Sequence, residues 1–126
     1  MVQGHKNVIQ PLCVFLITVF VLGACVNHDI DAPVIVSCAD ETAISFEINV
    51  RPIINSNCAI SGCHNGDLDN NLNWTILKNF QDHAGEIKRR ITLPLSDSDK
   101  MPRVGKLTYD QIKVISCWVE QGAKDN

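Results

Sequence analysis

The apolar positions near the C-terminus recur at a spacing of three and four residues, which predicts a helix over about 108–122. The side chains that share one face of this helix are Ile112, Ile115 and Val119, with Trp118 beside them. Residues 108–111 (Thr-Tyr-Asp-Gln) match a capping box, in which the first and last side chains satisfy each other's backbone N–H groups. Gly122 ends the helix, because glycine readily adopts the left-handed conformation found after a helix C-terminus.

Shorter helices are predicted over about 46–55, 74–80 and 85–91. Pro52 lies inside the first of them, where a proline removes a hydrogen-bond donor and clashes one turn back. We therefore expect this helix to kink or to begin late. Residues 92–106 contain two prolines, a glycine and scattered charges, which predicts an irregular loop. No alternating strand pattern of useful length appears, so the predicted fold class is all-α with long loops.

The first 25 residues have the pattern of an export signal. Lys6 adds a charge beside the terminal amine, and residues 12–22 are almost wholly apolar. This run is shorter than the roughly 20 apolar residues that span a bilayer, as is typical of a signal peptide. Residues 22–25 (Leu-Gly-Ala-Cys) resemble the lipobox of bacterial lipoproteins. The resemblance implies that Cys25 is lipidated and becomes the new N-terminus; an ordinary secretory signal or an uncleaved anchor is the alternative.

This pattern divides the chain into a signal peptide (1–24), a lipidated tether (25–44) and one globular domain (45–126). The tether has no helical period, and the domain has the size of one small folding unit. The formal net charge of the chain is −3, and its one basic run is short, at residues 88–90. The charge therefore offers no electrostatic reason to expect nucleic acid as a partner.

Residues 58–64 (Cys-Ala-Ile-Ser-Gly-Cys-His) carry the strongest chemical signal of the chain. Two thiols followed at once by an imidazole form the arrangement that attaches a c-type haem to protein. Cys58 and Cys63 would each form a thioether to the porphyrin, and His64 would be the proximal iron ligand, its other ring nitrogen held by a backbone carbonyl. The common spacing has two residues between the thiols, whereas this chain has four, so the motif needs support from elsewhere in the sequence.

Met101 is the candidate for the distal iron ligand. The other methionine of the chain lies in the signal, and the proline after Met101 stiffens a charged loop that is a poor place for a core gap-filler. His83 is the rival sixth ligand, and a solvated surface histidine is its plainer interpretation. Arg89, Arg90 and Arg103 are candidates to pair with haem propionates, because guanidinium groups suit carboxylates.

The six cysteines can all be assigned. Cys13 leaves with the signal, Cys25 would be lipidated, and two others would hold haem. Cys38 and Cys117 remain, in a compartment where disulfides persist, so we predict that they pair. Two free buried thiols are the alternative.

From about Ser45 to Ala123 the chain resembles the small monohaem cytochromes c of class I. The segment 46–54 is similar to their N-terminal helix, and the Met-Pro loop with the helix after it is similar to their C-terminal region. The resemblance implies three to four short helices and long loops around one covalently attached haem c. It also implies that the first and last helices cross, with Phe46 and Trp118 in contact. The spacing of the thiols and Arg103, where a second proline is frequent, depart from the family.

The resemblance implies single-electron transfer and no catalysis, with His64 and Met101 as axial ligands. The expected partners are redox proteins of the periplasm or membrane. Together with the lipid anchor, it predicts an exported, membrane-anchored lipoprotein facing the periplasm or the cell surface. Three alternatives stay open: a peroxidase or gas sensor with a labile sixth ligand, a haem-free disulfide-stapled lipoprotein acting as an interaction module, and a zinc site. The zinc ligands would be Cys58, Cys63, His64 and His83.

Overall fold

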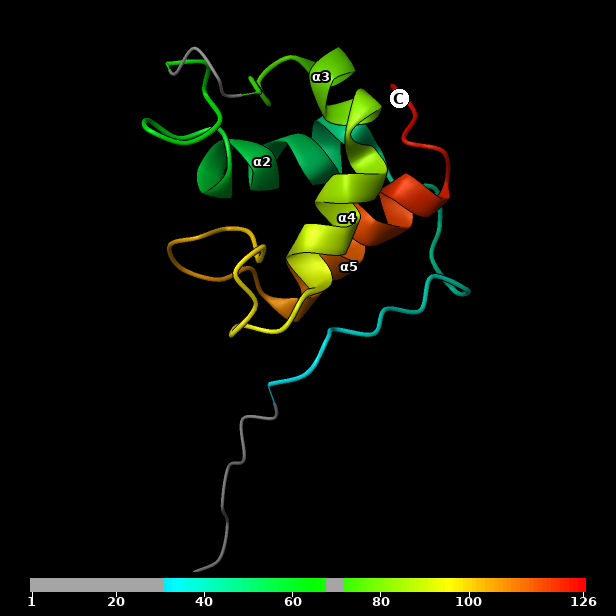
Figure 1. Ribbon diagram of the computed structural model, residues 1–126. Coiled ribbons are helices and arrows are strands. Elements are labelled where there is room, and N and C mark those ends of the chain that lie inside the picture. The colour runs from blue at the N-terminus through cyan, green and yellow to red at the C-terminus, as the bar shows by residue number, and fades with distance from the viewer. Residues whose placement is uncertain (1–30, 68–71) are drawn as a thin grey trace, which may run out of the picture. The chain divides into compact units, whose positions relative to one another are not determined.

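The computed structural model describes residues 31–67 and 72–126. The predicted signal peptide, Cys25 and the first residues of the predicted tether lie outside the described residues. Within those two ranges the chain is helical and contains no strand, so the all-α prediction is confirmed (Figure 1). In the same part of the chain, no helix combines the length and the apolar character needed to cross a membrane.

The helices lie close to where the periodicity predicts them. In chain order they are η2 (Phe46–Val50), α2 (Arg51–Asn57), α3 (Leu77–Asp82), α4 (Ala84–Thr92) and α5 (Tyr109–Glu120). The predicted capping box at the start of α5 is confirmed, since the Thr108 side chain accepts from the Gln111 N–H and the Gln111 side chain accepts from the Thr108 N–H. Only α3 differs noticeably from its predicted range of about 74–80, because it begins at Leu77 and ends at Asp82.

Pro52 shapes the first helix without interrupting it. The backbone N–H of Arg51 donates to the carbonyl of Phe46, five residues back, which makes η2 a turn of π-helix. Pro52 then occupies the first turn of α2, directly after this widened turn, and proline is tolerated in the first turn of an α-helix. The kink expected from the sequence therefore takes the form of one widened turn, and the helical path continues into α2.

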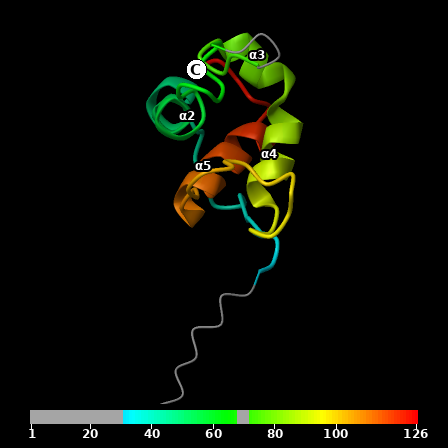
Figure 2. The ribbon, with the colours of Figure 1, turned by 60° about the vertical axis from the view of Figure 1, so that its left-hand side comes forward.

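The core forms where η2 and α5 meet. The ring centroids of Phe46 and Trp118 are 5.3 Å apart, so the predicted contact between the first and last helices is confirmed. The ring of Phe80, in α3, lies 6.4 Å from the ring of Phe46 and 5.7 Å from that of Trp118, centroid to centroid. All three side chains are fully buried. Helix α5 also packs against α4, so this one helix joins the two sides of the domain (Figure 2). Large aromatic side chains in mutual contact supply much of the burial available to a core of this size.

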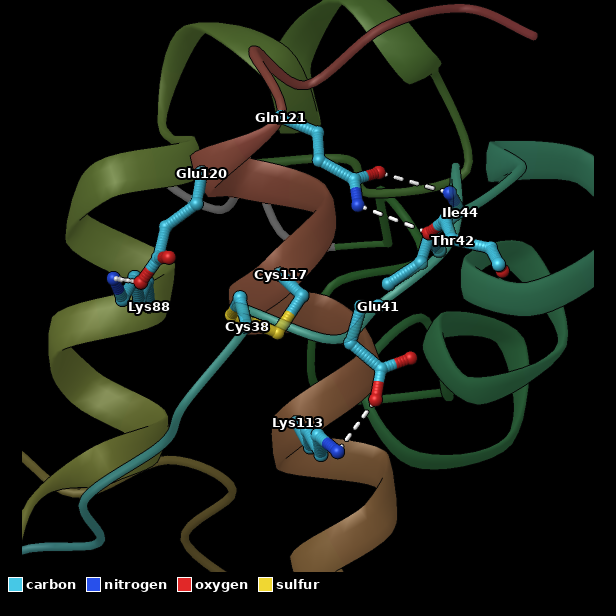
Figure 3. The surroundings of a disulfide bond; sticks show 9 residues. All are labelled: Cys38, Glu41, Thr42, Ile44, Lys88, Lys113, Cys117, Glu120 and Gln121. Atoms are coloured by element: carbon cyan, nitrogen blue, oxygen red, sulfur yellow. Dashed lines mark hydrogen bonds and ion pairs between the residues drawn. A yellow bond between two sulfur atoms is a disulfide. The ribbon is translucent and has the colours of Figure 1, made fainter.

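A disulfide joins the N-terminal part of the described chain to α5. Cys38 and Cys117 are bonded, with their Cα atoms 5.4 Å apart and 79 positions separating them in sequence (Figure 3). The structure thus contains the pairing that the cysteine count predicts. Cys117 is fully buried, so the bond is shielded from solvent on the α5 side.

Residues 31–44, here called the strap, follow the domain surface on both sides of this bond. At one end Gln121 accepts from the N–H of Ile44 at 2.8 Å and donates to the carbonyl of Thr42 at 3.0 Å (Figure 3). At the other end the N–H of Val34 donates to the carbonyl of Thr92 at 2.8 Å. The sequence predicts that these residues belong to the tether before the domain. In the structure the disulfide and these hydrogen bonds hold them to the helical domain.

Replacing Cys38 and Cys117 together by alanine is expected to lower the free energy of unfolding by about 4 kcal/mol, because the crosslink closes a long loop in the unfolded chain. Denaturant unfolding followed by circular dichroism measures the difference. Wild-type protein treated with a thiol reductant serves as the control and is expected to match the double variant. A loss under about 1 kcal/mol, well below the range typical of native disulfides, would contradict the prediction.

Candidate functional site

A cavity of about 380 Å³ brings together the residues that the sequence singles out. Cys58, Cys63 and His64 line it from the loop after α2, and Met101 lines it from the loop between α4 and α5. His83, at the junction of α3 and α4, lines the same cavity. The thiol, imidazole and thioether groups of the predicted site therefore share one space, although they come from segments far apart in sequence. Their roles toward a cofactor stay a prediction.

Apolar side chains from three segments form much of the cavity wall: Leu72, Trp74, Phe80, Ile87 and Ile91. Trp74, Phe80, Ile87 and Ile91 are buried in the core of the domain. Charged groups at the cavity come from Glu86, Arg90 and Arg103. An apolar pocket with a few convergent polar groups is the usual form of a cofactor or ligand site.

The loop between the two thiols closes on itself. The N–H of Cys58 donates to the Ile54 carbonyl at 2.8 Å, and the N–H of His64 donates to the Cys58 carbonyl at 3.0 Å. Gly62 has φ of +74°, a left-handed conformation that glycine adopts without steric cost. Because the His64 backbone bonds back to Cys58, the four-residue spacing still leaves both thiols and the imidazole at one cavity.

Cys58 and Cys63 are free thiols, each partly buried. Burial raises the pKa of the Cys58 thiol to about 11, and the nearby Cys63 adds to this shift. The Cys58 thiol is therefore protonated at neutral pH. Since the thiolate is the form that binds metal ions, a metal ion bound to Cys58 would have to displace this proton.

Residues 72–74 hold the His64 ring. Nδ1 of His64 lies 3.2 Å from the Leu72 carbonyl oxygen, and the Trp74 ring lies 4.7 Å from the imidazole, centroid to centroid. The N–H of Trp74 also donates to the His64 carbonyl at 2.8 Å. Donation from Nδ1 to a carbonyl places the proton there, so Nε2 is the ring nitrogen with the lone pair that metal ligation requires. A backbone carbonyl thus lies at one ring nitrogen, as expected from the sequence, and iron ligation by the other stays a prediction.

His83 is partly buried and lines the cavity, so it shares the space of the other predicted site residues. Its Nδ1 lies 2.9 Å from the Asn79 carbonyl oxygen, and its ring lies 5.6 Å from Trp74, centroid to centroid. Trp74 therefore contacts both histidines. Asp82 and Ala84, which flank His83 in sequence, give no sign of this environment, because it is created by packing between α3 and the loop after α2.

The three candidate arginines differ in their surroundings. Glu86 accepts hydrogen bonds from Arg89 at 2.7 and 2.8 Å and from Arg90 at 2.8 Å. Arg89 does not line the cavity, whereas Arg90 and the exposed Arg103 do. Among the described residues, Arg103 has no acidic partner, which makes it the cation at the cavity best placed to meet a carboxylate of a bound molecule.

In the described ranges, no three side chains of His, Cys, Asp or Glu gather in a group that could hold a metal ion. The four-ligand zinc site therefore gains no support from the packing. No family model, no curated protein and no solved structure matches the chain.

Replacing Glu86 by glutamine is expected to lower stability at neutral pH, by an amount that shrinks as the pH falls through about 2. Hydrogen bonds from Arg89 and then Arg90 lower the pKa of Glu86 from its ordinary value of 4.5 to about 2. Because the folded pKa is the lower one, the stabilisation is complete above pH 4.5 and is lost as the pH falls toward 2. Denaturant unfolding of both proteins across this range measures the effect; a difference at pH 2 as large as the one at neutral pH would contradict it.

Proposed function

We propose that this protein is an electron carrier that holds one haem c through Cys58 and Cys63, with His64 and Met101 as axial ligands. The observation that carries the proposal is the shared cavity, which both thiols, the imidazole and the thioether line together. A haem motif with an unusual spacing is weak support when it stands alone. Its convergence with the one methionine outside the predicted signal is the independent support that the motif needs.

The donor set fits a c-type haem. Two thiols beside a histidine are the groups that attach it, and imidazole with thioether is an axial pair found in cytochromes c. His64 has the tautomer that an iron ligand needs, because Leu72 holds its Nδ1 proton. When bound, the haem supplies a one-electron iron couple, whose potential the histidine–methionine pair raises.

The residues of the chain orient the ligands and exclude water. Leu72 and Trp74 fix the plane of the His64 ring, and the closed loop from Cys58 to His64 sets the positions of the thiols. Buried wall residues, among them Phe80 and Ile91, keep water from one side of the cavity. Arg103 and Arg90 line the cavity with positive charge and can receive the propionates.

The proposed fold is that of a class I cytochrome c. The crossing of η2 and α5 through Phe46 and Trp118, and the methionine loop directly before α5, support this assignment. The proposal includes export and lipidation at Cys25, so that the protein is anchored to a membrane and faces the periplasm or the cell surface. The disulfide supports an oxidising compartment. The partners would be redox proteins of that compartment.

The proposal is tested on protein expressed with export and haem-maturation machinery. We expect a sharp visible spectrum on reduction and a haem stain that stays with the chain in denaturing electrophoresis. A double variant, Cys58→Ala with Cys63→Ala, is expected to lose the stain because no thioether can form. A colourless wild-type chain would overturn the proposal and would favour the haem-free interaction module.

Replacing Met101 by alanine is expected to open the sixth position, lower the reduction potential and allow cyanide and carbon monoxide to bind readily. His83→Ala is the matched control, since His83 lines the same cavity and is expected to leave the potential and ligand binding unchanged. If His83→Ala produced the change and Met101→Ala did not, the axial assignment would be wrong. Ready binding of carbon monoxide by the wild type would favour the peroxidase or gas-sensor alternative.

A further inference from the structure

We infer that Lys100 is a positioning residue whose buried ammonium group, bound to the C-terminal end of α4, holds Met101 at the cavity. The inference rests on the proposed function, in which Met101 ligates iron. Lys100 precedes Met101 directly, yet only Met101 lines the cavity. The two neighbours thus have different surroundings: one is bound to a helix end and the other faces the site.

The burial of Lys100 is unusual for a lysine. Its exposed fraction is 8%, and among the described residues it is the one charged side chain that is buried. Lysine is almost never buried unless its ammonium group has a partner. The partner here is a backbone carbonyl: Nζ of Lys100 donates to the carbonyl oxygen of Ile91.

Ile91 lies in the last turn of α4. The last carbonyl groups of a helix have no intrahelical partner, and together they carry a partial negative charge from the helix dipole. A lysine ammonium at this position satisfies one of these carbonyls and complements the charge. Lys100 therefore caps α4 from a residue that lies outside the helix.

The same helix end contacts the same loop at two further points. Residues 99–101 of the loop meet residues 89–91 of α4 one to one. The pairs are Asp99 with Arg89 at 3.1 Å, Lys100 with Ile91, and the N–H of Met101 with the Arg90 carbonyl at 3.3 Å. The Asp99 pair is half exposed, and exposed ion pairs contribute little. The hydrogen bond from the buried Lys100 ammonium group to Ile91 is therefore the contact that most strongly opposes movement of the loop away from α4.

Movement of the loop away from α4 would break this bond and leave a buried carbonyl without a partner. Because Met101 is the next residue, such movement also withdraws its side chain from the cavity. An added ligand that competes with Met101 binds in proportion to the population of this open form. Lys100 thus controls how often the sixth position is open, without touching the cofactor.

The test uses the haem-loaded protein with the substitution Lys100→Leu, which keeps an apolar side chain and removes the ammonium group. Loss of a hydrogen bond to a charged group is expected to raise the apparent affinity for added imidazole by about tenfold to a hundredfold. The reduction potential falls in the same variant, and the Met101 amide exchanges its hydrogen faster in the ferrous protein. Lys100→Gln, which keeps a weaker donor, is expected to give smaller changes in the same direction.

Lys106→Leu is the matched control. Lys106 lies in the same loop and is exposed, and within the described part of the chain its side chain makes no hydrogen bond or ion pair. This variant is expected to have the wild-type imidazole affinity, potential and amide exchange. The control separates loss of a lysine from loss of this particular contact.

Wild-type imidazole affinity and wild-type amide exchange in Lys100→Leu would overturn the inference. If that variant fails to fold, the same result in Lys100→Gln would overturn it. Faster exchange with unchanged imidazole affinity would show that Lys100 holds the loop while Met101 is not the ligand, which contradicts the axial assignment and this inference with it. A wild-type chain without covalent haem would instead contradict the proposed function at its first step.

Discussion

The contact between Phe46 and Trp118 joins the two ends of the domain, and the rest of the structure depends on it. Phe80 completes this buried aromatic cluster and brings α3 to the same point. The packing of these rings fixes the position of α5, which contacts both η2 and α4. The fixed helix ends in turn limit the paths that the connecting loops can take. The disulfide acts on the same helix, because Cys117 immediately precedes Trp118 and secures the strap to it.

The candidate site is a consequence of this packing. Its thiols follow α2, its histidines flank Trp74 and α3, and its methionine lies on the loop that returns from α4 to α5. The helices bring these segments to one cavity, and local bonds then set each donor. Leu72 sets the tautomer of His64, and Lys100 secures the loop that contains Met101. A backbone carbonyl accepts the hydrogen bond in both cases.

The proposed function, electron transfer, requires few groups beyond these ordered ligands. A carrier needs a cofactor held at fixed ligands in an apolar pocket, and it needs no acid, base or substrate site. The Cys58 thiol is protonated at neutral pH, because burial raises its pKa to about 11. The presence of His83 at the same cavity gives the site a second imidazole, whose Nδ1 is likewise held by a carbonyl.

Features that depend only on residues close together in the sequence could be predicted from it. The capping box of α5 and the helical periods depend on contacts within a few positions, and the thiol–imidazole motif depends on spacing alone. Cys38 and Cys117 could be paired because the other cysteines had assignments. Only the tertiary structure decided that Met101 shares a cavity with His64, that Lys100 is buried, and that the strap is bound to the domain. These properties depend on which distant segments pack together and exclude water, and no local pattern encodes that.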